Sequence, residues 1–168
     1  MPKIIENLPQ KLLEEARRQA AAGGYSAVTV RSVAKACGVG VGTVYNYYAS
    51  KDALLAASML EQWHCCTDAI QAAAQTAGDA APVLECIYHC LQQFIRDNKA
   101  IFEDKSASQS FAGSFSQYHS LLRSQLADPL RKFCQGDFEA EFIAEALLTW
   151  TAAGKGYEEI KRILQKIL

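Results

Sequence analysis

Polar and aromatic side chains gather in one short stretch of the chain, residues 29–51, which reads TVRSVAKACGVGVGTVYNYYASK. The pattern predicts two short helices around a glycine-centred turn, with Thr43, Asn46 and Tyr47 in the second helix. Hydroxyl and amide groups of these types can bind the phosphates and the base edges of duplex DNA. The layout is that of a helix that enters a major groove while its flanks hold phosphates.

Each polar group in the second short helix suggests a role from its own chemistry. Thr43 lies at the start of that helix, where its side chain can reach a base edge or a phosphate. Gly42 keeps the backbone slim there, so that its amide can approach a phosphate. Asn46 is the best candidate for a base contact, because its amide can pair with adenine at two points. Tyr47 can contact the DNA backbone or a thymine methyl group.

The start of the first short helix supplies two further candidates. Thr29 is expected to cap that helix, and both Thr29 and Arg31 are expected to reach the DNA backbone. Arg31 can also reach a guanine. Each of these side chains taken alone is equally consistent with a solvated surface residue. Their combination within 29–51 is what favours a nucleic-acid contact.

The charge distribution fits the same interpretation. Residues 1–52 carry seven Lys and Arg against four Asp and Glu, a net charge of +3, while the remainder carries ten against fourteen, a net charge of −4. The overall net charge of −1 therefore conceals a basic first part and an acidic remainder. A basic module of this kind suits a polyanion, although chance scatter of charge produces such a difference as well.

The elements around this stretch are expected to be helices throughout. Half of the 168 residues are hydrophobic, only four are proline, and no alternating β-branched run occurs. The apolar spacing predicts an all-α fold of about nine helices, three of them in a head. We expect the head to span residues 1–50 and a helical body to span residues 51–168. The Ser- and Gly-rich stretch 105–117 is expected to be a loop or a broken helix, and Pro129 to kink or end a helix.

Local signals predict where the first helices begin and end. Gly23 and Gly24 are expected to stop the first helix, and Gly38 is expected to end the second. A third short helix is expected from about Val41 to Tyr47, and Ser50 is expected to cap a long fourth helix.

The sequence gives no sign of a membrane segment. No apolar stretch reaches the about 18 residues that a spanning helix needs. The N-terminal residues lack the apolar region of a signal peptide. We therefore expect a cytoplasmic protein.

The six cysteines allow a sensor or an enzyme to be considered. They show none of the paired spacings of a zinc module, and small buried thiols are common in helical cores. We therefore expect no metal and no cofactor. A metal or redox site is conceivable from the following residues: His64, Cys65, Cys86, His89 and Cys90. An enzyme would need a nucleophile such as Cys65, Cys66 or Cys90, but no Ser-His-Asp set, phosphate-binding glycine loop or metalloprotease motif supports it, so we expect no enzyme.

The segment from Thr29 to Leu55, TVRSVAKACGVGVGTVYNYYASKDALL, closely resembles the signature of the TetR-family bacterial transcription regulators. The resemblance implies that Tyr45 donates its hydroxyl to a phosphate, that Lys51 clamps another phosphate, and that Tyr48 is buried. Gly40 and Val41 depart from the family, which often carries Ser and Lys or Gln there. This departure removes a polar side chain that could contact a base, and Val41 can make only an apolar contact with a thymine methyl group.

The resemblance also implies a homodimer that binds a palindromic DNA operator and is released by a small-molecule effector. The last two helices supply a candidate dimer interface, although the same stripe can be core: Phe142, Ala146, Leu147, Trp150, Ala153, Ile160, Leu164 and Ile167. The body supplies candidate lining residues for an effector pocket, for which core packing is the alternative: Trp63, Phe94, Phe102, Phe111, Phe115, Tyr118, His119 and Leu122. Control by thiol oxidation, a metal or a protein partner is the alternative to a small molecule.

Overall fold

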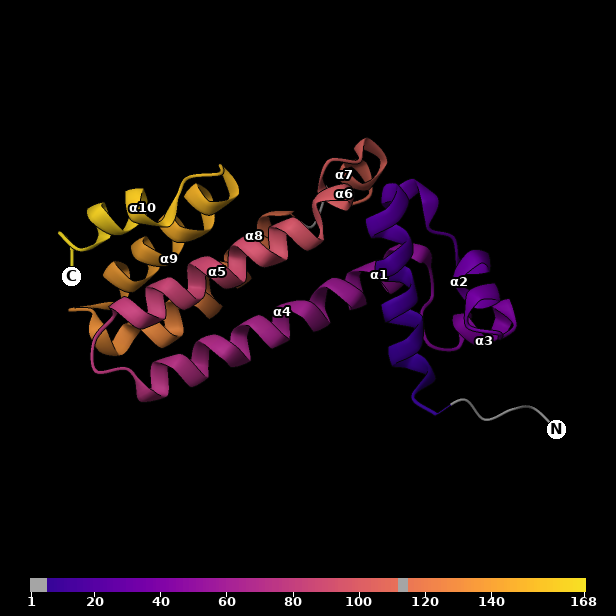
Figure 1. Ribbon diagram of the computed structural model, residues 1–168, viewed down its shortest axis with the longest axis horizontal. Helices are drawn as coiled ribbons and strands as arrows, with labels where there is room; N and C mark the ends of the chain where they lie inside the picture. The colour runs from indigo at the N-terminus through magenta and orange to yellow at the C-terminus, as the bar shows by residue number, and fades with distance from the viewer. Residues whose placement is uncertain (1–5, 112–114) are drawn as a thin grey trace. The chain divides into compact units, whose positions relative to one another are not determined.

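The computed structural model describes residues 6–111 and 115–168, and within them it contains ten α-helices, one 3-10 helix and no strand (Figure 1). The prediction of an all-α fold is confirmed. The count exceeds the expected nine by one helix, α7 (Lys105–Phe111), which forms in the stretch that was expected to be a loop or a broken helix. No helix in the described residues is long and apolar enough to cross a membrane.

The chain divides into two compact units, each made of two segments. The first unit comprises Met1–Gln62 and Asp97–Ala112, and the second comprises Trp63–Arg96 and Gly113–Leu168. The boundary expected between residues 50 and 51 does not coincide with this division. The reason is that Leu54 and Ile101 lie in the same hydrophobic cluster as the first helices.

The first unit is built around α1, whose apolar side chains recur at helical spacing and are buried. Its helices are α1 (Leu8–Ala27), α2 (Val30–Ala36), α3 (Val41–Tyr45), the first part of α4 (Lys51–Thr76), α6 (Lys99–Phe102) and α7. Figure 1 shows α2 and α3 beside α1. The core of this unit contains the fully buried Leu12, Val33 and Val44, together with Ile101 of α6 and Ala107 of α7.

Gly24 interrupts α1 without ending it. Its φ of 75° lies in the left-handed region, and a Cβ atom there would be 3.3 Å from the carbonyl oxygen of Ala100. The chain then resumes helical geometry as far as Ala27. The expected stop at this glycine is therefore a kink.

The helix α4 is unbroken from Lys51 to Thr76, and its residues belong to both units. Ser50 caps it, as predicted, since its hydroxyl oxygen accepts a hydrogen bond from the Ala53 amide at 3.0 Å. Leu54 and Leu55 lie in the core of the first unit, whereas Trp63, Ile70 and Ala74 lie in the core of the second.

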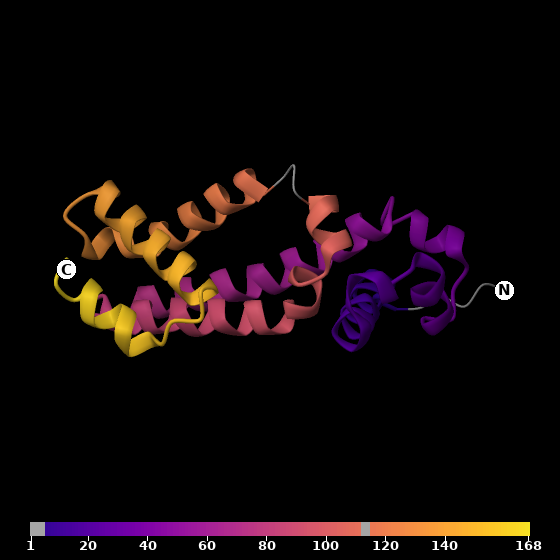
Figure 2. The same cartoon turned by 90° about the horizontal axis from the view of Figure 1, so that it is seen from above.

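The second unit packs the later part of α4 with the remaining helices. These are α5 (Ala81–Asp97), α8 (Phe115–Ala127), the 3-10 helix η2 (Asp128–Phe133), α9 (Asp137–Ala152) and α10 (Tyr157–Leu164). Figure 2 shows α8 and α9 next to each other, and they are in contact. Pro129 ends α8 as expected, because the chain continues from Asp128 as a 3-10 helix.

Candidate nucleic-acid interface

The turn between α2 and α3 is closed by backbone hydrogen bonds that require a glycine. Gly38 has a φ of 69°, in the left-handed region. The Val39 amide donates to the Ala34 carbonyl at 3.0 Å and the Gly38 amide donates to the Lys35 carbonyl at 3.2 Å. This pair of bonds is a Schellman motif, which satisfies the last carbonyls of α2. The turn thus directs the chain from α2 into α3.

The helix α3 places one side in the core and leaves the other exposed. Val44 is fully buried, and residues two positions before and after it lie about 200° around the helix from it. Gly42 and Asn46 therefore share the exposed side, and both are exposed. Tyr45 is 50% exposed, and Tyr47 is 51% exposed.

The helix α3 ends at Tyr45, two residues before the expected end at Tyr47. The Tyr47 amide donates to the carbonyl of Val44, three residues back, so the last turn tightens. Asn46 and Tyr47 therefore lie at the C-terminal end of α3 and just beyond it. Tyr48 is half-buried against the core, and its hydroxyl donates to the Pro9 carbonyl at 3.4 Å, which agrees with the expected buried position.

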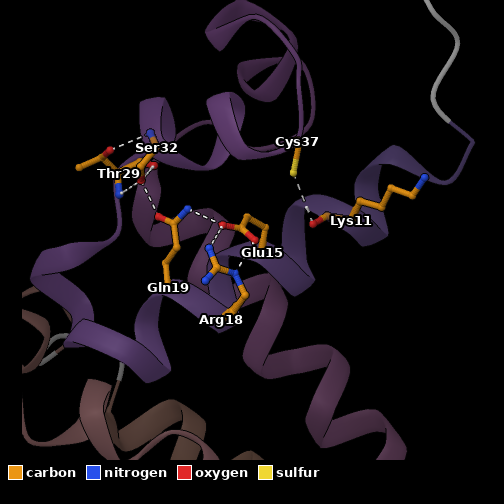
Figure 3. Close-up of polar contacts among 7 residues, drawn as sticks. All are labelled: Lys11, Glu15, Arg18, Gln19, Thr29, Ser32 and Cys37. Atoms are coloured by element: carbon orange, nitrogen blue, oxygen red, sulfur yellow. Dashed lines mark hydrogen bonds and ion pairs between the residues drawn. The ribbon is translucent and has the colours of Figure 1, made fainter.

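Thr29 caps α2 as predicted, in a reciprocal arrangement with Ser32. The Thr29 hydroxyl oxygen accepts from the Ser32 amide at 2.9 Å, and the Thr29 amide donates to the Ser32 hydroxyl oxygen at 3.1 Å. The Ser32 hydroxyl also donates to the side-chain oxygen of Gln19 at 2.5 Å. Figure 3 shows how this contact ties the start of α2 to α1. Ser32 and Gln19 were not among the predicted site residues.

The Gln19 side chain is itself held by an ion pair on α1. Its amide nitrogen donates to Glu15 at 2.7 Å, and Arg18 donates twice to the same carboxylate, at 2.6 and 2.8 Å (Figure 3). The hydrogen bonds from Arg18 lower the pKa of Glu15 from 4.5 to about 2, with a further contribution from Gln19. The carboxylate therefore stays ionised at every pH at which the protein is expected to bind DNA.

The remaining DNA candidates are placed as follows. Arg31 is exposed on the first turn of α2, while Thr43 on α3 is half-buried. Val41 packs against the core of the first unit, which leaves less of it for a thymine contact than the sequence indicated. Lys51 is half-buried. Its ammonium group donates to the Tyr25 carbonyl at 3.2 Å and lies 3.5 Å from the centre of the Tyr25 ring. Tyr25 was not among the site residues predicted from the sequence.

The candidate pocket residues fall in different places. Trp63 is buried in the second unit, where its ring lies 5.5 Å from that of Phe94 and its indole nitrogen donates to Gln125 at 2.6 Å. Leu122 packs against the same core.

Phe102 is exposed and belongs to the first unit, whereas Trp63 belongs to the second. Tyr118 is also exposed. His119 lies 3.4 Å from the carboxylate of Glu145 on α9. The side chains of Phe111 and Phe115 lie outside the described part of the chain.

The candidate interface residues separate into two groups. Leu147, Ile160 and Leu164 are buried in the core of the second unit, and Ile167 packs against that core. Phe142 and Trp150 of α9 are exposed, and so is Ala153, which caps the C-terminal end of that helix. Ala146 is half-buried and packs against the core of the second unit. Phe138, which the sequence analysis did not include, is 81% exposed and lies one turn before Phe142.

All six cysteines are thiols. Cys66 on α4, rather than the exposed Cys65, faces Cys90 on α5, since each thiol contacts the backbone carbonyl of the other residue at 3.8 and 3.9 Å. The contact with Cys66, together with burial, raises the pKa of the Cys90 thiol, and burial raises that of Cys86 to about 11. Both stay protonated at neutral pH, which disfavours their oxidation.

The surroundings of these thiols do not suggest a metal site either. Over residues 6–111 and 115–168, no group of three or more His, Cys, Asp and Glu side chains is arranged to hold a metal ion.

Comparison with protein families gives a match over residues 12–58, to the family described as bacterial regulatory proteins, tetR family. This segment contains α2, the turn and α3, and it reaches into α4. The match confirms the resemblance predicted from residues 29–55. Comparison with curated protein sequences gives no match.

Solved structures with this fold are known. A putative transcriptional regulator from Streptomyces coelicolor, SCO7518, aligns with a TM-score of 0.72 and 14% identity over 94% of this chain and 96% of its own. The TetR-family repressor AlkX from a Dietzia strain, implicated in biodegradation of n-alkanes, aligns with a TM-score of 0.65 and 19% identity, over 94% of this chain and 98% of its own. CifR is a TetR-family transcriptional regulator solved as a cysteine mutant with 26-bp double-strand operator DNA. It aligns with a TM-score of 0.63 and 13% identity, over 99% of this chain and 97% of its own. At these identities the likeness establishes the fold.

Proposed function

We propose that this protein, a TetR-family regulator by its DNA-binding domain in residues 12–58, is a repressor that binds a palindromic operator as a homodimer. We further propose that a small molecule bound in the second unit releases it from the operator. DNA binding and transcription regulation come with the family. The palindrome, the dimer, the repression and the effector are the proposal.

The observation that carries the proposal is the exposed side of α3. Val44 fixes the helix in the core, and Gly42, Tyr45, Asn46 and Tyr47 remain exposed in consecutive turns. A helix held in this way after a tight turn can enter a major groove. A packing role does not account for this side of the helix, because Tyr45 and Tyr47 each leave about half of their surface exposed.

The proposed contacts divide into those that hold phosphates and those that read bases. Asn46 is assigned to an adenine and Arg31 to the backbone or a guanine. Thr29 keeps a hydroxyl proton for a phosphate, because its oxygen only accepts within the capping box. The other phosphate contacts are assigned to Gly42, Thr43, Tyr45 and Lys51, while Tyr47 contacts the backbone or a thymine methyl.

The proposed dimer rests on the exposed side of α9. Phe138, Phe142, Ala146, Trp150 and Ala153 follow one another at spacings of three or four residues, so they form one stripe along the helix. Its large members, Phe138, Phe142 and Trp150, are exposed, whereas Ile143 and Leu147 are buried on the other side of the helix. Ala146 also packs against the core of the second unit, so it borders both sides. An apolar stripe of this size on a soluble helix is typical of a protein interface. A twofold dimer would present two copies of α3 to two half-sites.

The proposed effector site is the aromatic group around Trp63, Phe94 and Leu122, with Gln125 as its polar member. Aromatic side chains with few polar groups suit a flat or lipophilic ligand. Trp63 lies in the middle of α4, and Lys51 at the start of that helix belongs to the DNA-binding unit. A ligand that displaces Trp63 would therefore act on the helix that carries a phosphate contact.

The test is selection of bound fragments from genomic DNA by the purified protein. We expect the selected fragments to share a palindrome whose half-sites are about one DNA turn apart, roughly 34–36 Å. Genes next to the selected sites indicate which compounds to add in a release assay. Fragments without a common sequence would contradict the proposal of an operator, and a common sequence without a palindrome would contradict the homodimer.

A further inference from the structure

The ammonium group of Lys51 is held before any DNA is present. It donates to the backbone carbonyl of Tyr25 at 3.2 Å, and it lies 3.5 Å from the centre of the Tyr25 ring. Both contacts come from the same residue, one from its backbone and one from its side chain. An ammonium group has three donors, so two remain for another acceptor. Tyr25 therefore orients this group without saturating it.

Tyr25 is in turn fixed by two other elements of the first unit. It comes directly after the kink at Gly24, and it is only 7% exposed. Its hydroxyl donates to the carboxylate of Asp52 on α4 at 2.5 Å and lies 3.1 Å from the hydroxyl of Ser110 on α7. The hydrogen bond to Asp52 raises the pKa of Tyr25, so the phenol keeps its proton.

A second set of contacts holds α7 at the end of α1. The carboxylate of Asp104 accepts from the amide and the hydroxyl of Ser26, at 3.2 and 3.1 Å. Its other oxygen accepts from the Ser106 amide at 2.8 Å, at the start of α7, and Ala107 is buried in the core of the unit. The hydroxyl of Ser110 therefore reaches Tyr25 from a helix that is itself anchored.

We propose that Tyr25 is a positioning residue that holds the Lys51 ammonium ready for a DNA phosphate, and that Ser110 of α7 acts on Lys51 through Tyr25. The inference rests on the proposed function, since it assumes that Lys51 contacts phosphate. It adds that a helix more than 50 residues away in the sequence tunes this contact.

The physical reason is pre-organisation. A lysine side chain loses rotamer freedom when it binds a phosphate, and that loss weakens the contact. Two contacts with Tyr25 restrict the side chain in the unbound protein, so less freedom is lost on binding. Displacement of Ser110 loosens the phenol, and through it the ring that faces the ammonium.

The test is a double-mutant cycle between Tyr25 and Lys51. Binding to a labelled duplex of mixed sequence is measured by fluorescence anisotropy over a range of salt, for the native protein, Tyr25→Leu, Lys51→Ala and the double variant. We expect Lys51→Ala to flatten the salt dependence by about 0.9 in log–log slope. We expect Tyr25→Leu to weaken binding in the native background. In the Lys51→Ala background we expect the same substitution to have an effect at least about twofold smaller, because residues in contact are energetically coupled. Equal weakening in both backgrounds would mean that Tyr25 only supports the fold and would overturn the proposal.

The role of α7 is tested with smaller changes. Tyr25→Phe keeps the ring and removes the hydroxyl, and Ser110→Ala removes its partner. Both are expected to weaken binding only when Lys51 is present, and Ser110→Thr, which restores a hydroxyl, is expected to recover it. Ser108→Ala is the matched control, because the Ser108 hydroxyl donates to the Asp104 carbonyl and not to Tyr25. Native binding in Ser110→Ala, or weakening that persists without Lys51, would overturn the link to α7.

Two further outcomes separate this inference from the proposed function. A native protein that binds neither this duplex nor the selected fragments contradicts the proposed function itself. A native protein that binds, with no coupling between Tyr25 and Lys51, contradicts only the positioning role. Thermal melting of every variant identifies those that do not fold, and if Tyr25→Leu is among them, Tyr25→Phe and Ser110→Ala carry the test.

Discussion

Asn46 is the residue of α3 whose side chain is best suited to read a base. It is exposed opposite the buried Val44, and its amide can both donate and accept. The polar groups that the family often has at the start of this helix are replaced here by Gly40 and Val41. Sequence preference should therefore depend strongly on this one amide.

We predict that Asn46→Ala relaxes the preference at one or two base pairs, at a cost of about 1–3 kcal/mol of discrimination at those positions. The reason is that alanine keeps the helix and removes the amide that can pair with adenine at two points. The measurement is binding to the selected operator and to its single-base variants. Lys51→Ala is the control, since loss of a phosphate contact should weaken all sequences alike. Lower affinity with unchanged preference would argue against base reading by Asn46.

Glu15 supports the cap of α2 indirectly. Its carboxylate, paired with Arg18, accepts from Gln19, and Gln19 in turn accepts from Ser32. The pKa of Glu15 is lowered from 4.5 to about 2, so its contribution to stability is complete above pH 4.5 and is lost as the pH falls from 4.5 towards 2. We predict that Glu15→Gln is less stable than the native protein at pH 7 and that the difference disappears near pH 2. Urea unfolding at a series of pH values measures it.

The matched control is Glu14→Gln, at the neighbouring exposed position of α1. The difference between the native protein and Glu15→Gln should exceed that for the control. A difference that stays constant from pH 7 down to pH 2 would show that the carboxylate charge does not stabilise the fold.

At the scale of the element, α9 has two apolar sides that differ in exposure. One side, including Ile143 and Leu147, is buried within the second unit. The other exposes Phe138, Phe142 and Trp150. The sequence predicted one wide stripe, and it could not divide it, because apolar side chains look alike whether they face their own protomer or a partner.

We predict that Trp150→Glu converts a dimer into monomers, because a charge within the exposed stripe would be buried without a partner. Sedimentation velocity measures the change. Ala152→Glu, which adds the same charge on an exposed position of α9 outside the stripe, should leave the dimer intact. A Trp150→Glu protein that still sediments as a dimer would place the interface elsewhere.

The helix boundaries show which signals are local. The cap at Thr29, the stop at Gly38 and the cap at Ser50 were predicted correctly, because each depends on residues within one turn. The orientation of Lys51 could not be predicted, because Tyr25 lies 26 residues earlier in the chain. The same holds for the contact of Trp63 with Gln125, 62 residues later.

At the scale of the whole molecule, the first unit depends on a segment from the middle of the sequence. Ile101 and Ala107 are buried among side chains of the first helices. Sequence analysis placed this segment in the body, since nothing in residues 97–112 marks it as part of the DNA-binding unit. Contacts of this kind are set by the tertiary fold.

We predict that Ile101→Ala destabilises the first unit by about 2–5 kcal/mol, because it leaves a cavity in its core. Hydrogen exchange should show faster exchange of the α1 amides, and DNA affinity should fall although Ile101 is remote from α3 in the sequence. Lys99→Ala, at an exposed position of the same helix, is the control. Native protection of α1 in Ile101→Ala would show that α6 contributes little to this unit.

The division of the first unit between Met1–Gln62 and Asp97–Ala112 has a consequence for how the protein is made. During synthesis the N-terminal segment leaves the ribosome first, at about 5–20 residues per second. Its core stays incomplete for the few seconds until Ile101 and Ala107 emerge, after all of α5 has been translated. A nascent or prematurely terminated chain that ends within α5 therefore lacks part of the core of the DNA-binding unit, and we expect it to bind DNA more weakly than the complete protein does.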